Sequence, residues 1–235
     1  MKKYKTDWYL YYLINVTFII LVSFPIYWAF VSSIKPPDEL ITNTPTLFPI
    51  NPTFESYERI WNLEPTSSRG NIRSAFMNSA IVSIGTVVVS AVISTLAAYA
   101  LTILRTPFRH FIFLLIIMPI LIPGISLLIP LYKLVKELGL MNSYLGLILI
   151  HSTGMLTLGV FLMRNAFMSI PTSLREVALL EGSSELRILF TVMLPLAIPG
   201  LLTLMVFALY GAWNDFILAF LFVNTIDMEM LNVFL

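Results

Sequence analysis

Long apolar segments recur along most of this chain, and they constrain its fold more than any other feature. A helix needs roughly 20 residues to cross a hydrocarbon layer of about 30 Å. Five segments of this kind can be placed, at about residues 9–34, 76–104, 111–133, 143–163 and 196–223. Only 11% of the 235 residues are charged, whereas a soluble domain carries about 25%. Because helices satisfy their backbone hydrogen bonds internally, we predict an all-α integral membrane protein, a single polytopic helical bundle over residues 1–235.

The start of the chain, MKKYKTDWYLYYLINVTFIILVSFPIYWAFVSSIK, is basic like a signal peptide, but its apolar run is too long and no small-residue cleavage site follows. We therefore predict an uncleaved first span. Lys2, Lys3 and Lys5 place the N-terminus in the cytoplasm, because basic residues concentrate on that side. Alternation of the spans brings five arginines to the same side, so that eight of the 14 basic residues are cytoplasmic: these three lysines and Arg105, Arg109, Arg164, Arg175 and Arg187. Residues 35–75 then form an external loop, and residues 165–195 form a cytoplasmic loop.

Small residues are frequent in the second span: Ser79, Ser83, Gly85, Ser90, Ala91, Ser94, Ala97 and Ala98. They let helix backbones approach closely, so we predict a packed helix, with a pore lining as the alternative. The third span contains Pro119, Pro123 and Pro130, with Gly124 among them. Each proline removes a backbone hydrogen bond and kinks the helix. Interrupted helices often flank transport pathways, and a purely structural kink is the alternative.

Catalytic and metal-binding patterns are absent from the sequence. There is no cysteine, and His110 and His151 are the only histidines. No glycine-rich phosphate loop is present, and the spans contain no paired carboxylates. We therefore predict a protein that is not an enzyme and has no cofactor or metal site of its own.

Two polar patches in the spans are candidates for a translocation pathway. Asp215 is the only carboxylate in a predicted span, and at about 1.5 Å per residue it lies roughly 30 Å along the fifth span, near its outer end. Aromatic and amide side chains recur around it: Phe207, Tyr210, Trp213 and Asn214. They suit a hydroxyl-rich solute, and they suit an interfacial aromatic belt equally well. The second patch is in the fourth span, where interhelical hydrogen bonding is the simpler explanation: His151, Ser152, Thr153 and Thr157.

The block REVALLEGSSELRILFTVMLPL, residues 175–196, is unusually polar for a connection between two spans. Ser173 stands three residues before Glu176, the spacing of a capping box, which predicts a helix start there. Gly182 is expected to end this helix, and Ser184 can cap a second one. One face of the first helix is apolar, with Leu174, Val177 and Ala178. The second helix has an apolar stripe at i, i+3, i+4 and i+7, with Leu186, Leu189, Phe190 and Met193.

The polar face of this block is acidic, with Glu176, Glu181 and Glu185. A helix that lies on anionic lipid normally carries Lys and Arg on its polar face. We therefore predict a helical hairpin, closed by Pro195, that docks on a protein partner with basic residues.

The spacing of the block resembles the signature loop of the membrane permease subunits of binding-protein-dependent ABC importers. That loop reads Glu-Ala-Ala, three residues, Gly, then about nine residues to an apolar-x-Leu-Pro ending. The matching positions are Glu176, Val177, Ala178, Gly182, Val192, Leu194 and Pro195. The departures are mild: Val177 for alanine, Glu181 for aspartate and Ser183 for alanine. The resemblance implies a type I importer permease fold whose loop docks into a cleft of a cytoplasmic ATPase, with these residues for coupling: Glu176, Val177, Ala178, Glu181, Gly182, Ser183, Leu186 and Pro195.

Further segments resemble the smaller permease of maltose-type carbohydrate importers: PTLFPINPTFESYERIW, AFMNS, IPLYKLVKELGLMNSYLGLIL, RNAFMSIPTSLREVA and AWNDF. This resemblance implies a bacterial or archaeal plasma membrane, a second homologous permease, two ATPase subunits that bind ATP and Mg, and an external solute-binding protein. Glycerol phosphate or another polyol is the alternative solute, and a stand-alone secondary transporter and a non-transporting scaffold are the alternative functions. Relatives of this type have six spans, and we expect the sixth to be missing from this sequence.

Overall fold

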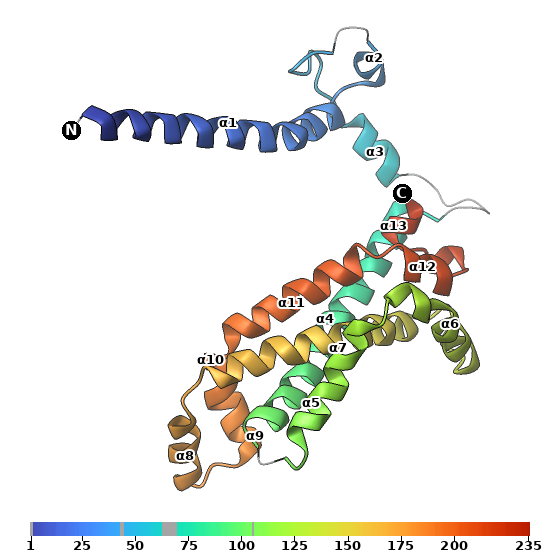
Figure 1. Ribbon diagram of the computed structural model, residues 1–235. Helices are drawn as coiled ribbons and strands as arrows, with labels where there is room; N and C mark the ends of the chain where they lie inside the picture. Colours follow the sequence, from blue (N-terminus) through green and yellow to red (C-terminus); the bar gives the residue numbers. More distant parts are fainter. Residues whose placement is uncertain (1, 43–44, 63–69, 105) are drawn as a thin grey trace. The chain divides into compact units, whose positions relative to one another are not determined.

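The computed structural model describes residues 2–42, 45–62, 70–104 and 106–235. It consists of two compact units, residues 1–64 and 65–235, and every regular element in the described parts is a helix (Figure 1). Three helices are long and apolar enough to cross a membrane, and the number rises to five if each of two sharply bent helix pairs is one span. The prediction of an all-α polytopic protein is therefore confirmed. Some predicted features lie outside the described residues: Arg105, residues 43–44 and 63–69 of the predicted external loop, and the side chains of Lys2, Lys3 and Lys5.

The first unit contains one long helix and two short ones: α1 (Lys2–Ser33), α2 (Pro37–Leu40) and α3 (Glu55–Trp61). The segment after α1 is held by its own polar contacts. The Lys35 ammonium group donates to the carbonyl of Thr46 (2.5 Å) and lies 5.1 Å from the centre of the Trp28 ring. The Glu39 carboxylate accepts a hydrogen bond from the amide of Ile50 (2.9 Å). The described residues of this segment thus form a loop with one short helix, α2.

In the second unit, α4 (Ile72–Thr102) packs mainly against α7 (Tyr144–Met168) and α11 (Ile198–Trp213) (Figure 1). The small residues predicted at this interface include buried ones: Ser79, Ser83, Ser90, Ser94 and Ala98. A Cβ added at Gly159 would lie only 2.3 Å from the Ser94 hydroxyl oxygen, and one added at Gly85 would lie 2.4 Å from the side chain of Ile148. The close helix packing expected from small residues is therefore confirmed.

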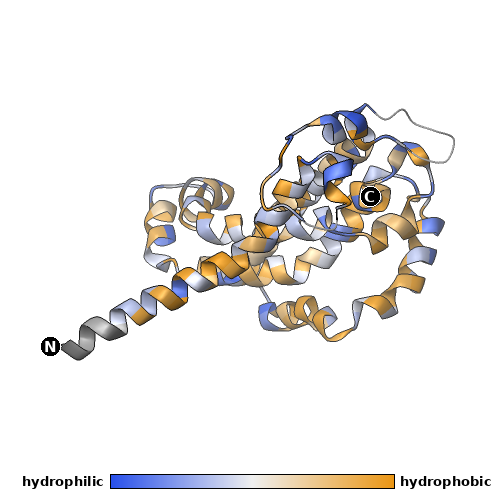
Figure 2. Cartoon of the chain, turned by 90° about the horizontal axis from the view of Figure 1, so that it is seen from above, coloured by the Kyte–Doolittle hydropathy of each residue, from blue (hydrophilic) through white to orange (hydrophobic). Residues whose placement is uncertain are grey.

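Much of the length of the helices consists of apolar residues, as the hydropathy colouring in Figure 2 shows. On α4 the exposed side chains include Ile84, Val88 and Val92. The buried residues of the same helix include six with a hydroxyl group: Ser79, Ser83, Thr86, Ser90, Ser94 and Thr95. A helix bundle surrounded by lipid has this arrangement, with polar residues inside and apolar residues outside.

The third predicted span is sharply bent, as its prolines led us to expect, and the bent helix pair runs over residues 109–137 where 111–133 was predicted. The chain forms α5 (Arg109–Ile117), η1 (Met118–Leu121), η2 (Gly124–Leu127) and α6 (Leu128–Glu137). The two halves meet at 97°. Pro119 and Pro123 flank the break, because a proline has no amide hydrogen with which to continue the helix. The carbonyl of Ile116, just before the break, accepts a hydrogen bond from the Thr157 hydroxyl of α7 (2.8 Å).

The fifth predicted span, 196–223, is also interrupted. It follows α10 (Leu194–Leu196) after a bend of 81°, and α11 already ends at Trp213. Asp215 therefore lies in a break between helices and not within a span. Its carboxylate accepts a hydrogen bond from the amide of Ala219 (3.0 Å), a contact that favours the start of a new helix. The remaining elements are α12 (Ile217–Phe222), η4 (Ile226–Met228) and α13 (Leu231–Phe234).

Candidate functional site

The acidic block forms two short helices, α8 (Thr172–Leu180) and α9 (Glu185–Ile188), joined by a tight turn (Figure 1). Pro171 is the N-cap of α8, and no side chain caps this end. Ser173 already lies inside the helix, so the predicted capping box with Glu176 is wrong. The fixed φ of proline favours a helix start two residues earlier than the capping box requires.

The turn after α8 is a Schellman motif. The amide of Gly182 donates to the carbonyl of Leu179 (3.0 Å), and the amide of Ser183 donates to the carbonyl of Ala178 (3.0 Å). Gly182 has a φ of 80°, in the left-handed region that glycine adopts without a steric penalty. The predicted role of Gly182 as the helix terminator is confirmed.

The second helix begins as predicted, because the Ser184 hydroxyl accepts a hydrogen bond from the amide of Arg187 (3.4 Å). Its apolar stripe differs from the prediction: Leu189 and Met193 are buried, but Leu186 and Phe190 are exposed. The reason is a stretch of π-helix, η3 (Leu189–Met193), which changes the number of residues per turn.

One carboxylate joins three helices at this end of the bundle. Glu185, the first residue of α9, accepts a hydrogen bond from the hydroxyl of Tyr99 on α4 (2.8 Å). It also forms a two-pronged ion pair with Arg175 of α8, in which Nε of the arginine lies 3.2 Å from Oε2. Hydrogen bonding to Arg175 holds the pKa of Glu185 below its usual value, and the Glu185 carboxylate raises the pKa of Arg175. Sequence reasoning did not identify this cluster, since Tyr99 is far away along the chain.

The face of α8 that points away from the bundle is both acidic and apolar. Ala178 is its only buried residue, while Val177 is 55% exposed and Leu180 is 89% exposed. Among the predicted coupling residues, Ser183 is half-buried, and these are exposed: Glu176, Val177, Glu181, Gly182, Leu186 and Pro195. In the described part of the chain, Glu176 and Glu181 have no ion-pair partner. Such a surface can bind a partner with apolar and basic groups.

The opposite end of α4 carries a different polar cluster. The Asn78 amide group donates to the carbonyls of Asp227 (2.9 Å) and Glu229 (3.0 Å), and it accepts from the Tyr144 hydroxyl (2.7 Å). At about 1.5 Å per residue, Asn78 and Tyr99 are roughly 30 Å apart on α4. This distance matches the thickness of a hydrocarbon layer.

Most of the predicted pathway residues lie toward the end marked by Asn78. His151 Nε2 of α7 and the Asp215 carboxylate are 3.9 Å apart, so the fold brings two of them together. The Trp213 ring packs edge-on against Phe76 of α4, with ring centres 5.3 Å apart. Tyr210 is exposed.

Two further pathway residues make internal contacts. The Asn214 side chain donates to the carbonyl of Tyr210 (2.9 Å). Thr157 is placed differently from the rest, because its hydroxyl donates to the α5 carbonyl of Ile116. The interhelical hydrogen bond considered for Thr157 in the sequence is therefore present.

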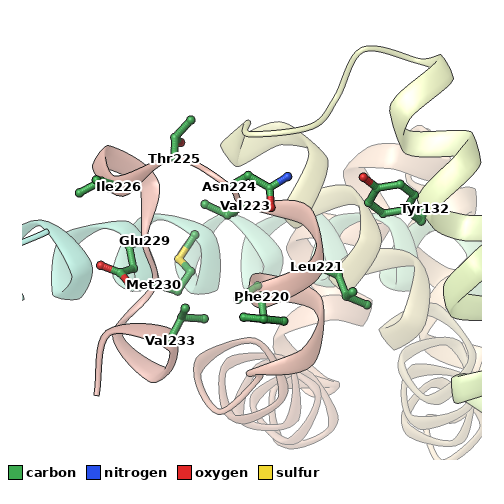
Figure 3. A pocket seen from close by; sticks show the side chains of 11 residues that line it. Tyr132, Phe220, Leu221, Val223, Asn224, Thr225, Ile226, Glu229, Met230 and Val233 are labelled. Atoms are coloured by element: carbon green, nitrogen blue, oxygen red, sulfur yellow. The ribbon is translucent and has the colours of Figure 1, made fainter. Parts of the chain in front are cut away.

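An open cavity of about 500 Å³ lies near α6, α12 and α13 (Figure 3). Its polar lining comes from Tyr132, Asn224, Thr225 and Glu229. Figure 3 shows Tyr132 on one side and Glu229 on the other. The Glu229 carboxylate accepts from the amide of Gly70 (3.3 Å), so this charge is partly engaged within the chain.

Comparison with known proteins identifies similar chains. A family model described as "binding-protein-dependent transport system inner membrane component" matches residues 90–231. The sulfoquinovosyl glycerol transport system permease protein SmoH of Agrobacterium fabrum is 34% identical over 217 residues, which cover 92% of this chain and 74% of the relative. The trehalose transport system permease protein SugB of Mycobacterium tuberculosis is 32% identical over 196 residues, covering 83% of this chain and 68% of the relative.

The fold is also found in a solved structure. One chain of a bacterial ABC transporter involved in the import of the acidic polysaccharide alginate matches with a TM-score of 0.87 at 23% identity. The match covers 99% of this chain and 80% of that chain. The arrangement of helices in this protein is thus shared with a membrane chain of an ABC transporter.

Proposed function

The chain belongs to the family of binding-protein-dependent transport system inner membrane components, and from this membership we propose that it is a permease subunit of an ATP-driven importer for a carbohydrate. In this proposal it forms half of the translocation pore with a second, homologous permease. Two ATPase subunits bind ATP and Mg and hydrolyse the ATP, while an external binding protein delivers the solute. The chain itself is non-catalytic and holds no cofactor.

The observation that carries the proposal is the exposed face of α8. Its carboxylates at Glu176 and Glu181 have no ion-pair partner in the described part of the chain, and apolar side chains lie exposed beside them. A compact acidic and apolar helix matches a partner cleft with basic and apolar walls. We assign the ATPase subunit as this partner, and the block 165–195 as the coupling loop.

The orientation in the membrane follows from this assignment. The end of the bundle with α8 and α9 faces the cytoplasm, and the end with Asn78 faces outward. The cytoplasmic N-terminus rests separately on Lys2, Lys3 and Lys5. The candidate solute pathway then lies toward the outer side, at His151, Tyr210, Trp213, Asn214 and Asp215. We leave out Thr157, whose hydroxyl is already engaged with Ile116.

A carbohydrate is the solute class that the relatives support best. The names of two of them refer to sulfoquinovosyl glycerol and to trehalose, and both contain a sugar. Aromatic and amide side chains such as Trp213 and Asn214 suit such a solute, because the ring covers C–H groups and the amide meets hydroxyls. A screen of sugars and polyols for stimulation of ATP hydrolysis in liposomes tests this. Stimulation only by glycerol phosphate or another polyol would contradict it.

The structure offers a matched pair of glycines with which to test docking. Gly182 and Gly139 both have positive φ, of 80° and 67°, and both end a helix in a Schellman motif. A Cβ added at either one meets nothing within 4 Å. An arginine at each position therefore carries the same backbone penalty of about 1–2 kcal/mol, and only the surroundings outside the chain differ.

We expect Gly182→Arg to abolish co-purification of the ATPase subunit and solute-stimulated ATP hydrolysis, because the new side chain projects from the docking face. Gly139→Arg should leave both unchanged. Equal co-purification of the ATPase with the two variants would contradict the assignment of the docking face. Absence of any ATPase from the purified wild-type complex, together with solute uptake driven by an ion gradient, would favour a secondary transporter.

A further inference from the structure

We propose that Tyr99, Glu185 and Arg175 form a latch that joins α8 and α9 to α4, so that a push on α8 moves the membrane span. The inference rests on the proposed function, since it concerns how force received from an ATPase reaches the spans. It assigns positioning roles to three residues that do not touch the ATPase-docking face described above.

The geometry of the latch joins three separate elements at one carboxylate. Oε2 of Glu185 accepts from both the Tyr99 hydroxyl (2.8 Å) and Nε of Arg175 (3.2 Å), and Oε1 accepts from the second arm of the guanidinium group. A two-pronged arginine–carboxylate pair restricts rotation as well as distance. The hydrogen bond to Tyr99 therefore links an already rigid α8–α9 pair to α4.

The anchor on the α4 side is firm. Tyr99 is 4% exposed, and its ring packs edge-on against Phe167 of α7, with ring centres 5.6 Å apart. Both residues belong to a core cluster that also contains Ile188 and Leu189 of the hairpin. A displacement of Glu185 is thus transmitted to a side chain that cannot move without α4 and α7.

The α8 helix, in contrast, has little else to hold it. Ala178 is its one buried residue, and α8 receives no other ion pair in the described part of the chain. The α9 helix remains anchored through Ile188 and Leu189, which are fully buried. Without the latch, α8 would remain folded and exposed for docking, but it could rock without moving α4.

The test uses Tyr99→Phe, which removes the hydroxyl and keeps the ring on Phe167. In the reconstituted transporter, we expect the ATPase subunits to co-purify as in the wild type. The amount of solute moved per ATP hydrolysed should fall by roughly tenfold, the factor that corresponds to the loss of one hydrogen bond to a charged group. Tyr144→Phe is the matched control, because it removes a phenol hydroxyl bonded to Asn78 at the other end of α4, and the ratio should not change.

A second measurement separates transmission from folding. The chain has no cysteine, so spin labels can be placed at Leu180→Cys on α8 and Leu96→Cys on α4, both exposed. We expect the distance distribution between the labels to broaden in Arg175→Met, which removes the ion pair that ties α8 to Glu185, and to broaden less in Arg175→Lys, which retains the charge.

Three results would overturn the latch: a wild-type ratio of solute to ATP in Tyr99→Phe, an unchanged distance distribution in Arg175→Met, or an equal loss in Tyr144→Phe. Loss of ATPase co-purification in Tyr99→Phe would also overturn it, because the residue would then shape the docking face itself. An error in the proposed function would give a different result, namely normal co-purification of the ATPase with Gly182→Arg.

Discussion

Gly159 of α7 allows the most direct test of how closely the bundle helices pack. A Cβ built at this position would lie 2.3 Å from the hydroxyl oxygen of Ser94 on α4 and 2.9 Å from the side chain of Leu204 on α11. Both distances are far below van der Waals contact. The substitution Gly159→Ala therefore forces all three helices to adjust.

The magnitude can be worked out with a second glycine of the same helix. Overpacking a filled interface costs about 1–3 kcal/mol, while replacing glycine by alanine in a helix gains up to about 1 kcal/mol. At Gly154 of α7 nothing lies within 4 Å of an added Cβ, so Gly154→Ala should show the gain alone. The gain in helix propensity is the same at both positions and cancels in the comparison. Gly159→Ala should therefore be less stable than Gly154→Ala by about 1–3 kcal/mol.

The assay is reversible unfolding of the purified protein in mixed micelles, followed by loss of helical circular dichroism. A rescue variant sharpens it: Ser94→Ala removes the oxygen nearest to the new methyl group, and that oxygen has no hydrogen-bond partner among the described residues. The double variant Ser94→Ala/Gly159→Ala should recover much of the lost stability. Equal stability of Gly159→Ala and Gly154→Ala would refute the close approach of α4 and α7.

Two further predictions concern single polar contacts. Thr157→Val leaves the Ile116 carbonyl at the α5 break without its partner and should lower the free energy of unfolding by about 1–3 kcal/mol. Thr153→Val is the control, because the hydroxyl of Thr153 bonds within its own helix, and it should cost less in the same unfolding assay. Equal losses of stability would contradict a role for Thr157 at the break. The pKa of Glu185 is held below its usual value of 4.5 by Arg175, so its ion pair stabilises the hairpin above about pH 4.5 and is lost as the pH falls through the lower, folded-state pKa. A nitroxide on α8 should become more mobile over that acidic range, and equal mobility at all pH values would contradict the linkage.

The sequence alone was sufficient for features that depend on neighbouring residues. The apolar runs located α1, α4 and α7, because the length of a span is set by the thickness of the membrane. Gly182 and Ser184 were recognised as the end and the start of helices, since these roles need only local backbone hydrogen bonds. The same local reasoning placed the start of α8 two residues too late, because Pro171 and not Ser173 is its N-cap.

Tertiary structure decided everything that depends on how the helices pack. Pro119 and Pro123 predicted an interruption of the third span, but the angle of 97° and the end of α11 at Trp213 depend on how the helices pack. The contact between Tyr99 and Glu185 joins residues 86 positions apart, and the approach of His151 to Asp215 joins α7 to the break between α11 and α12. No local rule predicts such pairs, because they arise only when the spans have packed. The sequence thus determined which segments cross the membrane and where the hairpin turns, and the packed bundle decided which side chains connect them.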